Sequence, residues 1–206
     1  MVAFFDFEFE SHVMVDHHPD DGVSPVSKSI TYSIVEYDDK LWIDRNLGAD
    51  RVAAAYYDNS PEAAGWYWQF NRKLGFKYED FERTPDTEWI SSINENSHWT
   101  SDNDPCAILL GDEWRIPAID EWERINDWNG NASVVGAFAS PLKIHAAGGL
   151  HPQHGILTGR GDTGNYWSRS QYDNTTSYSL NLYNSGSHIM NPSKTFGQSV
   201  RCVKDR

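Results

Sequence analysis

The stretch Tyr166-Trp167-Ser168-Arg169-Ser170-Gln171-Tyr172-Asp173-Asn174, with the closing run Ser199-Val200-Arg201-Cys202-Val203, is the part of the chain from which a fold can be predicted. Between Tyr166 and Val200, Ser, Tyr and Asn fill 16 of 35 positions, whereas Leu, Ile, Val, Met, Phe and Trp fill seven. Tyr offers a large amphipathic surface, and Ser and Asn offer short hydrogen-bonding groups. A core strand is richer in β-branched residues. The composition is therefore typical of a contact surface, and a pair of surface hairpins with solvated faces is the alternative.

The apolar residues that interrupt this polar run are expected to act as fixed anchors beneath it. They are Trp167, Leu180, Leu182, Ile189, Met190, Phe196 and Val200.

The pattern Y-W-S-x-S-x-Y-D-N followed by G-x-S-V-R-C-V resembles the C-terminal end of C-type-lectin-fold proteins. More narrowly, it is similar to the variable proteins of diversity-generating retroelements, a group that includes phage tropism determinants and lectin-like domains of bacterial surface proteins. Upstream, Cys106-x7-Trp114-Arg115-Ile116-Pro117-x4-Trp122 resembles the C-x-x-G-W-R-L-P-T-x-x-E-W element of that group. The spacing after the Cys is longer here, and Glu113 replaces the Gly. Residues 41–48 resemble its opening strand.

The resemblance implies an α+β chain with a C-type lectin fold, that is, irregular antiparallel sheets with one or two helices and long loops. The ligand-binding domain would span 29–206, after an N-terminal strand and connecting segment over 1–28. It further implies a disulfide between Cys106 and Cys202, with two buried free thiols of a cytosolic protein as the alternative.

In this group, substitutions arise at adenines of a template, so that an AAC codon for Asn can become one for Tyr, Ser, Thr, Asp, His, Gly or Arg. Gln171 is not reached in this way but lies within the polar run. The predicted variable, ligand-binding surface positions are Arg169, Gln171, Asp173, Asn174, Thr175, Ser177, Tyr178, Asn181, Tyr183, Asn184, His188 and Asn191. The residues expected to hold the backbone are Trp114, Trp122, Trp167, Leu180, Leu182, Val200, Cys106 and Cys202.

Length and charge limit the classes of partner. A chain of 206 residues suits one domain. The net charge of −13 disfavours nucleic acid and anionic membranes, since both need a basic face. Residues 1–10 lack the features of a signal peptide, and no run reaches the roughly 18 apolar residues of a membrane span. We expect attachment to a host-cell surface protein or glycan, from a virion (tail tip) or a cell surface, and the pattern specifies no subunit number.

Local patterns predict several elements. Phe5, Phe7 and Phe9 alternate with acids, as in a strand with one wet face. Strands are expected over 29–37 and 41–44, a helix start at Ser60-Pro61, and an amphipathic helix over 117–125. Residues 65–70 are expected to form a buried aromatic strand or loop, 71–104 insertion loops, and 129–164 short strands and turns.

We predict a chain that is not an enzyme and needs no cofactor. Residues 101–104 could hold a structural calcium ion but lack the alternation of a calcium loop, so a solvated turn is favoured. His145, His151 and His154 are interpreted as loop histidines, because their spacing suits no metal site. Two alternatives remain: a constant bacterial adhesion domain for glycan or protein, and a relative of formylglycine-generating enzymes, which would need a redox-active Cys.

Overall fold

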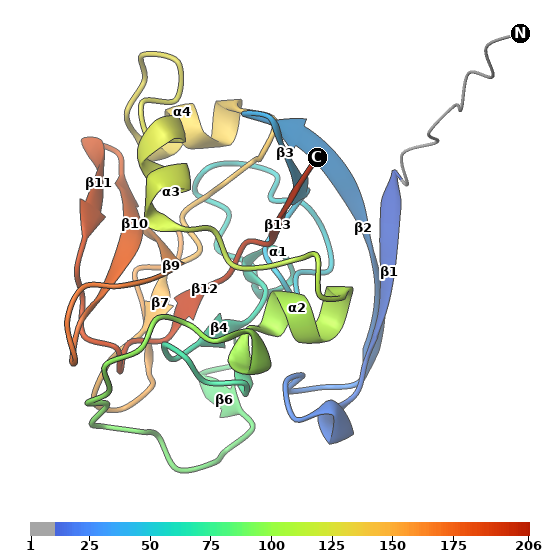
Figure 1. Cartoon of the computed structure of the whole chain (residues 1–206), viewed down its shortest axis with the longest axis vertical. Coiled ribbons are helices and arrows are strands. Elements are labelled where there is room, and N and C mark those ends of the chain that lie inside the picture. The colour runs from blue at the N-terminus through green and yellow to red at the C-terminus, as the bar shows by residue number, and fades with distance from the viewer. Residues whose placement is uncertain (1–10) are drawn as a thin grey trace, which may run out of the picture.

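A seven-stranded sheet of order β11-β10-β9-β12-β4-β5-β6 lies at the centre of the computed structural model, which describes residues 11–206 (Figure 1). The described chain is α+β. All pairings in this sheet are antiparallel except that of β12 with β9. Its strands are β4 (Tyr67–Trp68), β5 (Gly75–Glu79), β6 (Glu82–Thr84), β9 (Gly164–Gln171), β10 (Ser177–Tyr183), β11 (Gly186–Met190) and β12 (Gln198–Ser199).

A second sheet, of order β1-β2-β3-β13, joins the early strands to the last one. β13 pairs with β3, with Val203 opposite Trp42. In Figure 1 this sheet lies to the right of β9–β11. Its strands are β1 (His12–His17), β2 (Lys28–Tyr37), β3 (Lys40–Ile43) and β13 (Val203–Asp205), and β7 (Gly149–Leu150) and β8 (Leu157–Thr158) form a separate hairpin.

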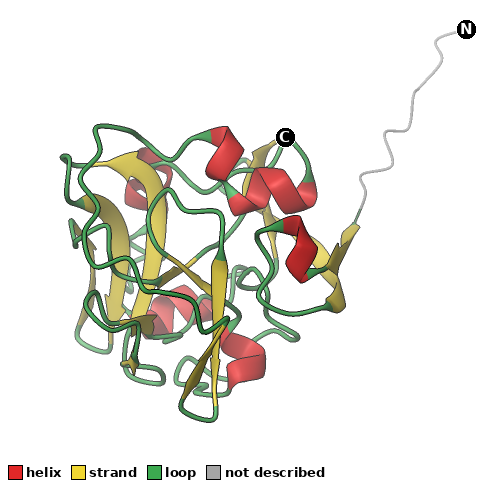
Figure 2. Cartoon of the chain, turned by 90° about the horizontal axis from the view of Figure 1, so that it is seen from below, coloured by secondary structure: helices red, strands yellow, loops and turns green. Residues whose placement is uncertain are grey.

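The helices are short, and much of the remaining chain is loop, drawn green in Figure 2. Ser60 caps the first helix, because its hydroxyl accepts the backbone N–H of Ala63 at 3.4 Å. The helices are α1 (Pro61–Ala64), α2 (Pro105–Leu110), α3 (Ile119–Ile125) and α4 (Val134–Ala139), with 3-10 turns η1 (Pro19–Asp21) and η2 (Ser101–Asn103).

Most of the predicted elements are present, but two stretches differ from the expectation. Residues 129–164 were expected to form short strands and turns, but they also contain helix α4. β2, β3, α1 and α3 occur where local patterns indicated them, and residues 65–70 are buried around β4. The expectation of loops throughout 71–104 is wrong, because the β5–β6 hairpin lies within it. The strand predicted at Phe5, Phe7 and Phe9 falls outside the described residues.

The central sheet separates two hydrophobic cores, and consecutive residues of one strand contribute to different cores. Tyr67 and Tyr166 belong to one cluster, whereas Trp68 and Trp167 belong to the other. Successive side chains of a strand point to opposite faces, so consecutive aromatic residues fill both cores. The indole N–H of Trp167 donates to the carbonyl of Trp68 at 2.6 Å, which fixes β9 against β4.

The two cysteines form a disulfide, so the alternative of free thiols is wrong. It joins Cys106 of α2 to Cys202, just before β13, and both residues are fully buried. The α2 end is fixed by Asp104, whose carboxylate accepts the N–H groups of Cys106 and Ile116, both at 2.9 Å. Because the bonded residues are 96 positions apart, the bond restricts a large part of the unfolded chain.

We expect the double variant Cys106→Ala/Cys202→Ala to lose about 2 to 5 kcal/mol of unfolding free energy, because the unfolded chain gains the freedom of a long loop. Urea unfolding followed by tryptophan fluorescence measures the change. Unfolding the unaltered chain with a reductant provides the matched comparison. An equal midpoint in all samples would contradict the prediction.

Candidate functional site

The predicted contact residues lie along two hairpins at one edge of the central sheet, β9–β10 and β10–β11 (Figure 1, left). They do not form one continuous patch: the turn at 172–176 and the turn at 184–185 close opposite ends of β10. Those with exposed side chains are Asp173, Asn174, Thr175, Asn184, His188 and Asn191, and those half-buried are Arg169, Gln171, Tyr178 and Tyr183.

The carboxylate of Asp173 stabilises the β9–β10 turn in which it lies. Asp173 Oδ1 accepts the backbone N–H of Thr175 at 2.7 Å and that of Thr176 at 2.8 Å. These bonds favour the ionised carboxylate and lower the pKa of Asp173 to about 2. Asn174 and Thr175 are therefore presented on a fixed turn. Tyr172, beside it, packs edge-on against Tyr178 with ring centroids 5.3 Å apart.

Gln171 is engaged within the molecule. Its Oε1 accepts the N–H of Ser97 at 2.8 Å and the ammonium of Lys194 at 3.0 Å. Its Nε2 donates to Asn96 at 2.6 Å. The segment 95–99 thus lies against β9, which nothing in the loop-like sequence of 71–104 indicated. Gln171 holds this segment to the hairpin.

Two predicted surface positions are buried, so the expectation of surface exposure is wrong for them. Ser177 is 0% exposed and Asn181 is 5% exposed. Ser177 Oγ donates to the carbonyl of Ser170, and Ser177 N–H donates to that of Pro192. Residues 192–196 therefore cover this part of β10. Small polar residues do not reveal from composition which face will be covered.

A concave pocket of about 280 Å³ lies on the same face of β9 and β10 as Asn181. We call it the amide pocket. Only two predicted contact residues, Asn181 and Tyr183, line it. The other lining residues lie in 149–165 and 190–198 and are not among the predicted contact residues: Gly149, Thr158, Thr163, Asn165, Met190, Pro192, Phe196 and Gln198.

Hydrogen bonds fix the floor of the amide pocket. Asn181 and Asn165 are directly opposite on β10 and β9, and Asn181 Nδ2 donates to Asn165 Oδ1 at 2.8 Å. Asn165 Nδ2 then donates to Thr163 Oγ1 at 3.3 Å, and Ser179 Oγ donates to Asn181 Oδ1 at 3.3 Å. The two amides therefore have defined orientations before any ligand arrives.

The side-chain oxygen of Gln198 is a buried hydrogen-bond acceptor that receives no hydrogen bond from residues 11–206. The side chain lines the amide pocket and is 2% exposed. A buried polar atom in this state is costly unless something else satisfies it. All ten lining residues are uncharged. The lining residues therefore offer no charge that could pair with a charged group.

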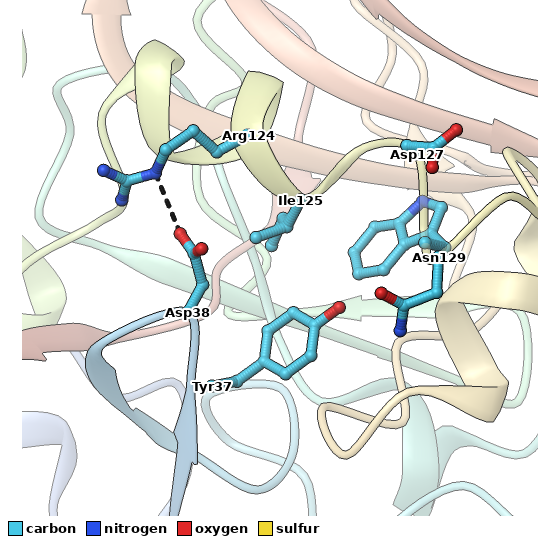
Figure 3. Close-up of a pocket in the computed structure, with 7 residues that line it drawn as sticks. Tyr37, Asp38, Arg124, Ile125, Asp127 and Asn129 are labelled. Carbon is cyan, nitrogen blue, oxygen red and sulfur yellow. Dashed lines mark hydrogen bonds and ion pairs between the residues drawn. The ribbon is translucent and has the colours of Figure 1, made fainter.

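A second pocket, of about 240 Å³, lies between the β2–β3 turn and the end of α3 (Figure 3). Figure 3 shows the Tyr37 hydroxyl and the Asn129 amide pointing toward one another. Its charged groups are paired: Arg124 Nε donates to Asp38 at 2.8 Å, and Asp127 accepts the N–H of Gly130. None of the predicted contact residues lines it.

No metal centre is apparent in the described part of the chain. Within 11–206, no group of three or more His, Cys, Asp or Glu residues could hold an ion. In the segment considered for calcium, the Asp104 carboxylate already accepts two backbone N–H groups. Burial nevertheless raises the pKa of Asp104 to about 6. The side chain of Asp104 therefore acts as the N-cap of α2.

His145 lies in the loop between α4 and β7, in agreement with its interpretation as a loop histidine, but it is buried. It is 1% exposed, and neither ring nitrogen has a hydrogen-bond partner within 11–206. Burial, followed by the nearby positive charge of Arg201, lowers the pKa of His145 to about 3. His151 and His154 stack on each other with ring centroids 5.8 Å apart. Within 11–206, the three histidines do not form a metal-binding group.

We expect Gln171→Ala to cost about 1 to 2 kcal/mol of unfolding free energy, because Ser97 N–H and the Lys194 ammonium each lose an acceptor. Asn174→Ala is the matched control; the Asn174 side chain is exposed, so its change stays within about 0.5 kcal/mol. Urea unfolding measures both. Equal losses would show that Gln171 does not hold segment 95–99.

Replacing His145 is expected to reduce the loss of stability in acid. The pKa of His145 is lowered in the folded state, so the unfolded chain gains a proton as pH falls below 6.5 while the folded chain stays neutral. The contribution of neutral His145 to the free energy of unfolding is fully present above pH 6.5 and is lost as the pH falls to about 3. Between pH 7 and 5, the original chain should lose about 2 kcal/mol more than His145→Phe. Denaturant unfolding at both pH values measures the difference. Parallel pH dependences would refute the assignment.

Comparison with known proteins adds no identification. Searches of protein-family models and of curated proteins give no match to this chain. Function must therefore be inferred from the geometry of the β9–β11 hairpins and the amide pocket.

Proposed function

We propose that this chain is a non-catalytic ligand-binding protein with a C-type-lectin-like fold, and that residues of about 166–200 form a contact surface varied by a retroelement. The observation that carries the proposal is the contrast between buried apolar residues and exposed polar residues within the hairpins. Trp167, Leu180, Leu182 and Val200 are all 0% exposed, whereas polar residues of the accompanying turns are exposed. Changes at exposed residues usually cost little stability, so such a surface can vary on a constant frame.

Packing of the motif residues supports the lectin-like fold. Cys106, Trp114 and Ile116 of the upstream motif share one hydrophobic cluster with Trp167 and Cys202 of the C-terminal motif. Trp122, in the other cluster, donates its indole N–H to the carbonyl of Trp167 at 3.1 Å. The residues that carry the resemblance are therefore in contact through the core, as one fold would require. The irregular antiparallel sheets and long loops also agree with it.

Attachment to a host-cell surface protein or glycan, from a virion or a cell surface, is the proposed role. The buried disulfide supports such a location, because disulfides persist in oxidising surroundings. No helix among the described residues is long and apolar enough to cross a membrane.

The structure offers no observation in favour of the enzyme alternative. Formylglycine-type chemistry would need a redox-active cysteine. Cys106 and Cys202 are bonded to each other and fully buried, and no other cysteine is present in the sequence.

Sequencing of the encoding DNA from the source population tests the proposal. We expect substitutions concentrated at adenines of the codons for the exposed hairpin residues, with Asn174 as the clearest case. Asn46 is a matched control, because its codon also begins with two adenines but its buried amide donates to Ala64 O and accepts from Arg201. The Asn46 codon should remain constant.

Equal variation at Asn174 and Asn46 would indicate ordinary drift and refute the retroelement. A uniform sequence at both positions would favour the constant adhesion domain.

A further inference from the structure

We propose that β1 is the interface of a homodimer, in which the β1 strands of two copies of this chain pair antiparallel about a two-fold axis through Met14. The interface lies in the sheet β1-β2-β3-β13 and not in the β9–β11 hairpins. The inference therefore goes beyond the proposed function and does not depend on it.

β1 is an edge strand. The order β1-β2-β3-β13 places it at one end of its sheet, and it lies at the outer margin of the molecule (Figure 1, right). Edge strands that avoid pairing with another chain usually carry Lys, Pro or a bulge. β1 has neither Lys nor Pro, its register with β2 is continuous from His12 to His17, and Met14 at its centre is 69% exposed. The strand therefore lacks the usual protection against pairing.

The free backbone groups of β1 belong to its even-numbered residues. In an antiparallel pair, residues that bond the neighbouring strand alternate with residues that face away from it. Ile34 N–H donates to the carbonyl of Ser11 at 2.8 Å, so the odd-numbered residues bond β2. The Ser33 carbonyl, opposite His12, instead accepts from Asp44 on the other side of β2. The residues whose N–H and C=O groups point to the open edge are His12, Met14 and Asp16.

The sequence of β1 is self-complementary about Met14. In the two-fold pairing, Met14 faces its own copy, and Val13 faces Val15 of the second copy. His12 faces Asp16 of the second copy. Apolar residues thus meet apolar residues, and an imidazole meets a carboxylate, which are cross-strand pairs that stabilise a sheet. An unrelated peptide has no reason to match this pattern, so a second copy is the partner that the strand fits.

The side chains of His12 and Asp16 are oriented by neighbours in their own copy. His12 Nδ1 shares a hydrogen bond with Ser11 Oγ at 2.8 Å, and Asp16 Oδ1 accepts the hydroxyl of Ser29. Within 11–206, these bonds leave Nε2 of His12 and Oδ2 of Asp16 to meet across the edge. The two-fold axis repeats the contact, so every dimer contains it twice.

The expected dimer is weak, because two short strands bury less surface than a standard protein interface. We expect a Kd on the order of 100 µM. Each copy carries a net charge of −13, so moderate salt is needed to screen their mutual repulsion. The β9–β11 hairpins lie on the opposite side of the molecule from β1 (Figure 1). Dimerisation therefore leaves both contact surfaces accessible, and two linked surfaces bind a repeated ligand more tightly than one.

Analytical ultracentrifugation of the full chain, from about 10 µM to about 1 mM in about 0.15 M salt, tests the inference. We expect the average mass to rise with concentration from that of one copy towards that of two. Met14→Pro should abolish the rise, because it removes an outward N–H that β2 does not use. Proline is tolerated on edge strands at such positions.

Charge variants test the register. His12→Asp should weaken the dimer about tenfold, because it places carboxylates opposite each other in both contacts. Asp16→Lys should weaken it to a similar extent, because it removes the carboxylate opposite His12. The double variant His12→Asp/Asp16→Lys restores opposite charges and should recover the dimer, which a misfolded chain could not do. Glu123→Lys is the matched control; Glu123 is exposed on α3, outside the interface, so this variant should dimerise as the original chain does.

A chain that stays monomeric at about 1 mM would overturn the inference. Dimerisation that Met14→Pro and the single charge variants leave unchanged would place the interface elsewhere and overturn it as well. Weakening by the single charge variants without recovery in the double variant would overturn the pairing about Met14. None of these results bears on variation at the Asn174 codon, so the dimer and the variable contact surface can fail separately.

Discussion

The position of Trp167 is the constraint on which the rest of the structure depends. Its indole N–H donates to Trp68 on β4, and its carbonyl receives the indole N–H of Trp122 on α3. These bonds connect β9 to strands on one side and to a helix from the other core. Phe70 packs on its ring at 5.6 Å. β9 is thus held from several directions, and β10 and β11 extend the sheet from it, with Leu180 and Leu182 of β10 packed in the same core cluster as Trp122.

The same arrangement explains why polar residues can occupy so much of the C-terminal region. Apolar burial is concentrated at a few residues, among them Tyr166, Trp167, Leu180 and Leu182. Between them, small polar side chains satisfy one another, as in the chain from Ser179 through Asn181 and Asn165. Amides and hydroxyls at the amide pocket are thereby held in place, which favours binding because less conformational freedom is lost.

Local sequence patterns predicted several of the helices and strands. The features that these patterns missed depend on contacts between residues far apart in the chain. The helix over 119–125 and strands β2 and β3 follow from periodicity and caps within a few residues. Helix α2 was not predicted, although Asp104-Pro105 is a helix start signal. The helix is short and is held by contacts outside it, namely the disulfide and the hydrogen bond from Ile116 N–H to the Asp104 carboxylate. The amide pocket could not be predicted, since its walls come from segments far apart in sequence. The burial of Asn181 and Gln198 depends on those same walls.

The link between Cys106 and Cys202 also affects what happens when the backbone is cut. Exposed turns of small polar residues, such as Asn184-Ser185, are where proteases cleave most readily. A single cut anywhere between the two cysteines leaves both fragments covalently joined. β12 and β13 would stay in their sheets, paired to β4 and β3. A cut there would therefore change the chain without releasing part of the domain.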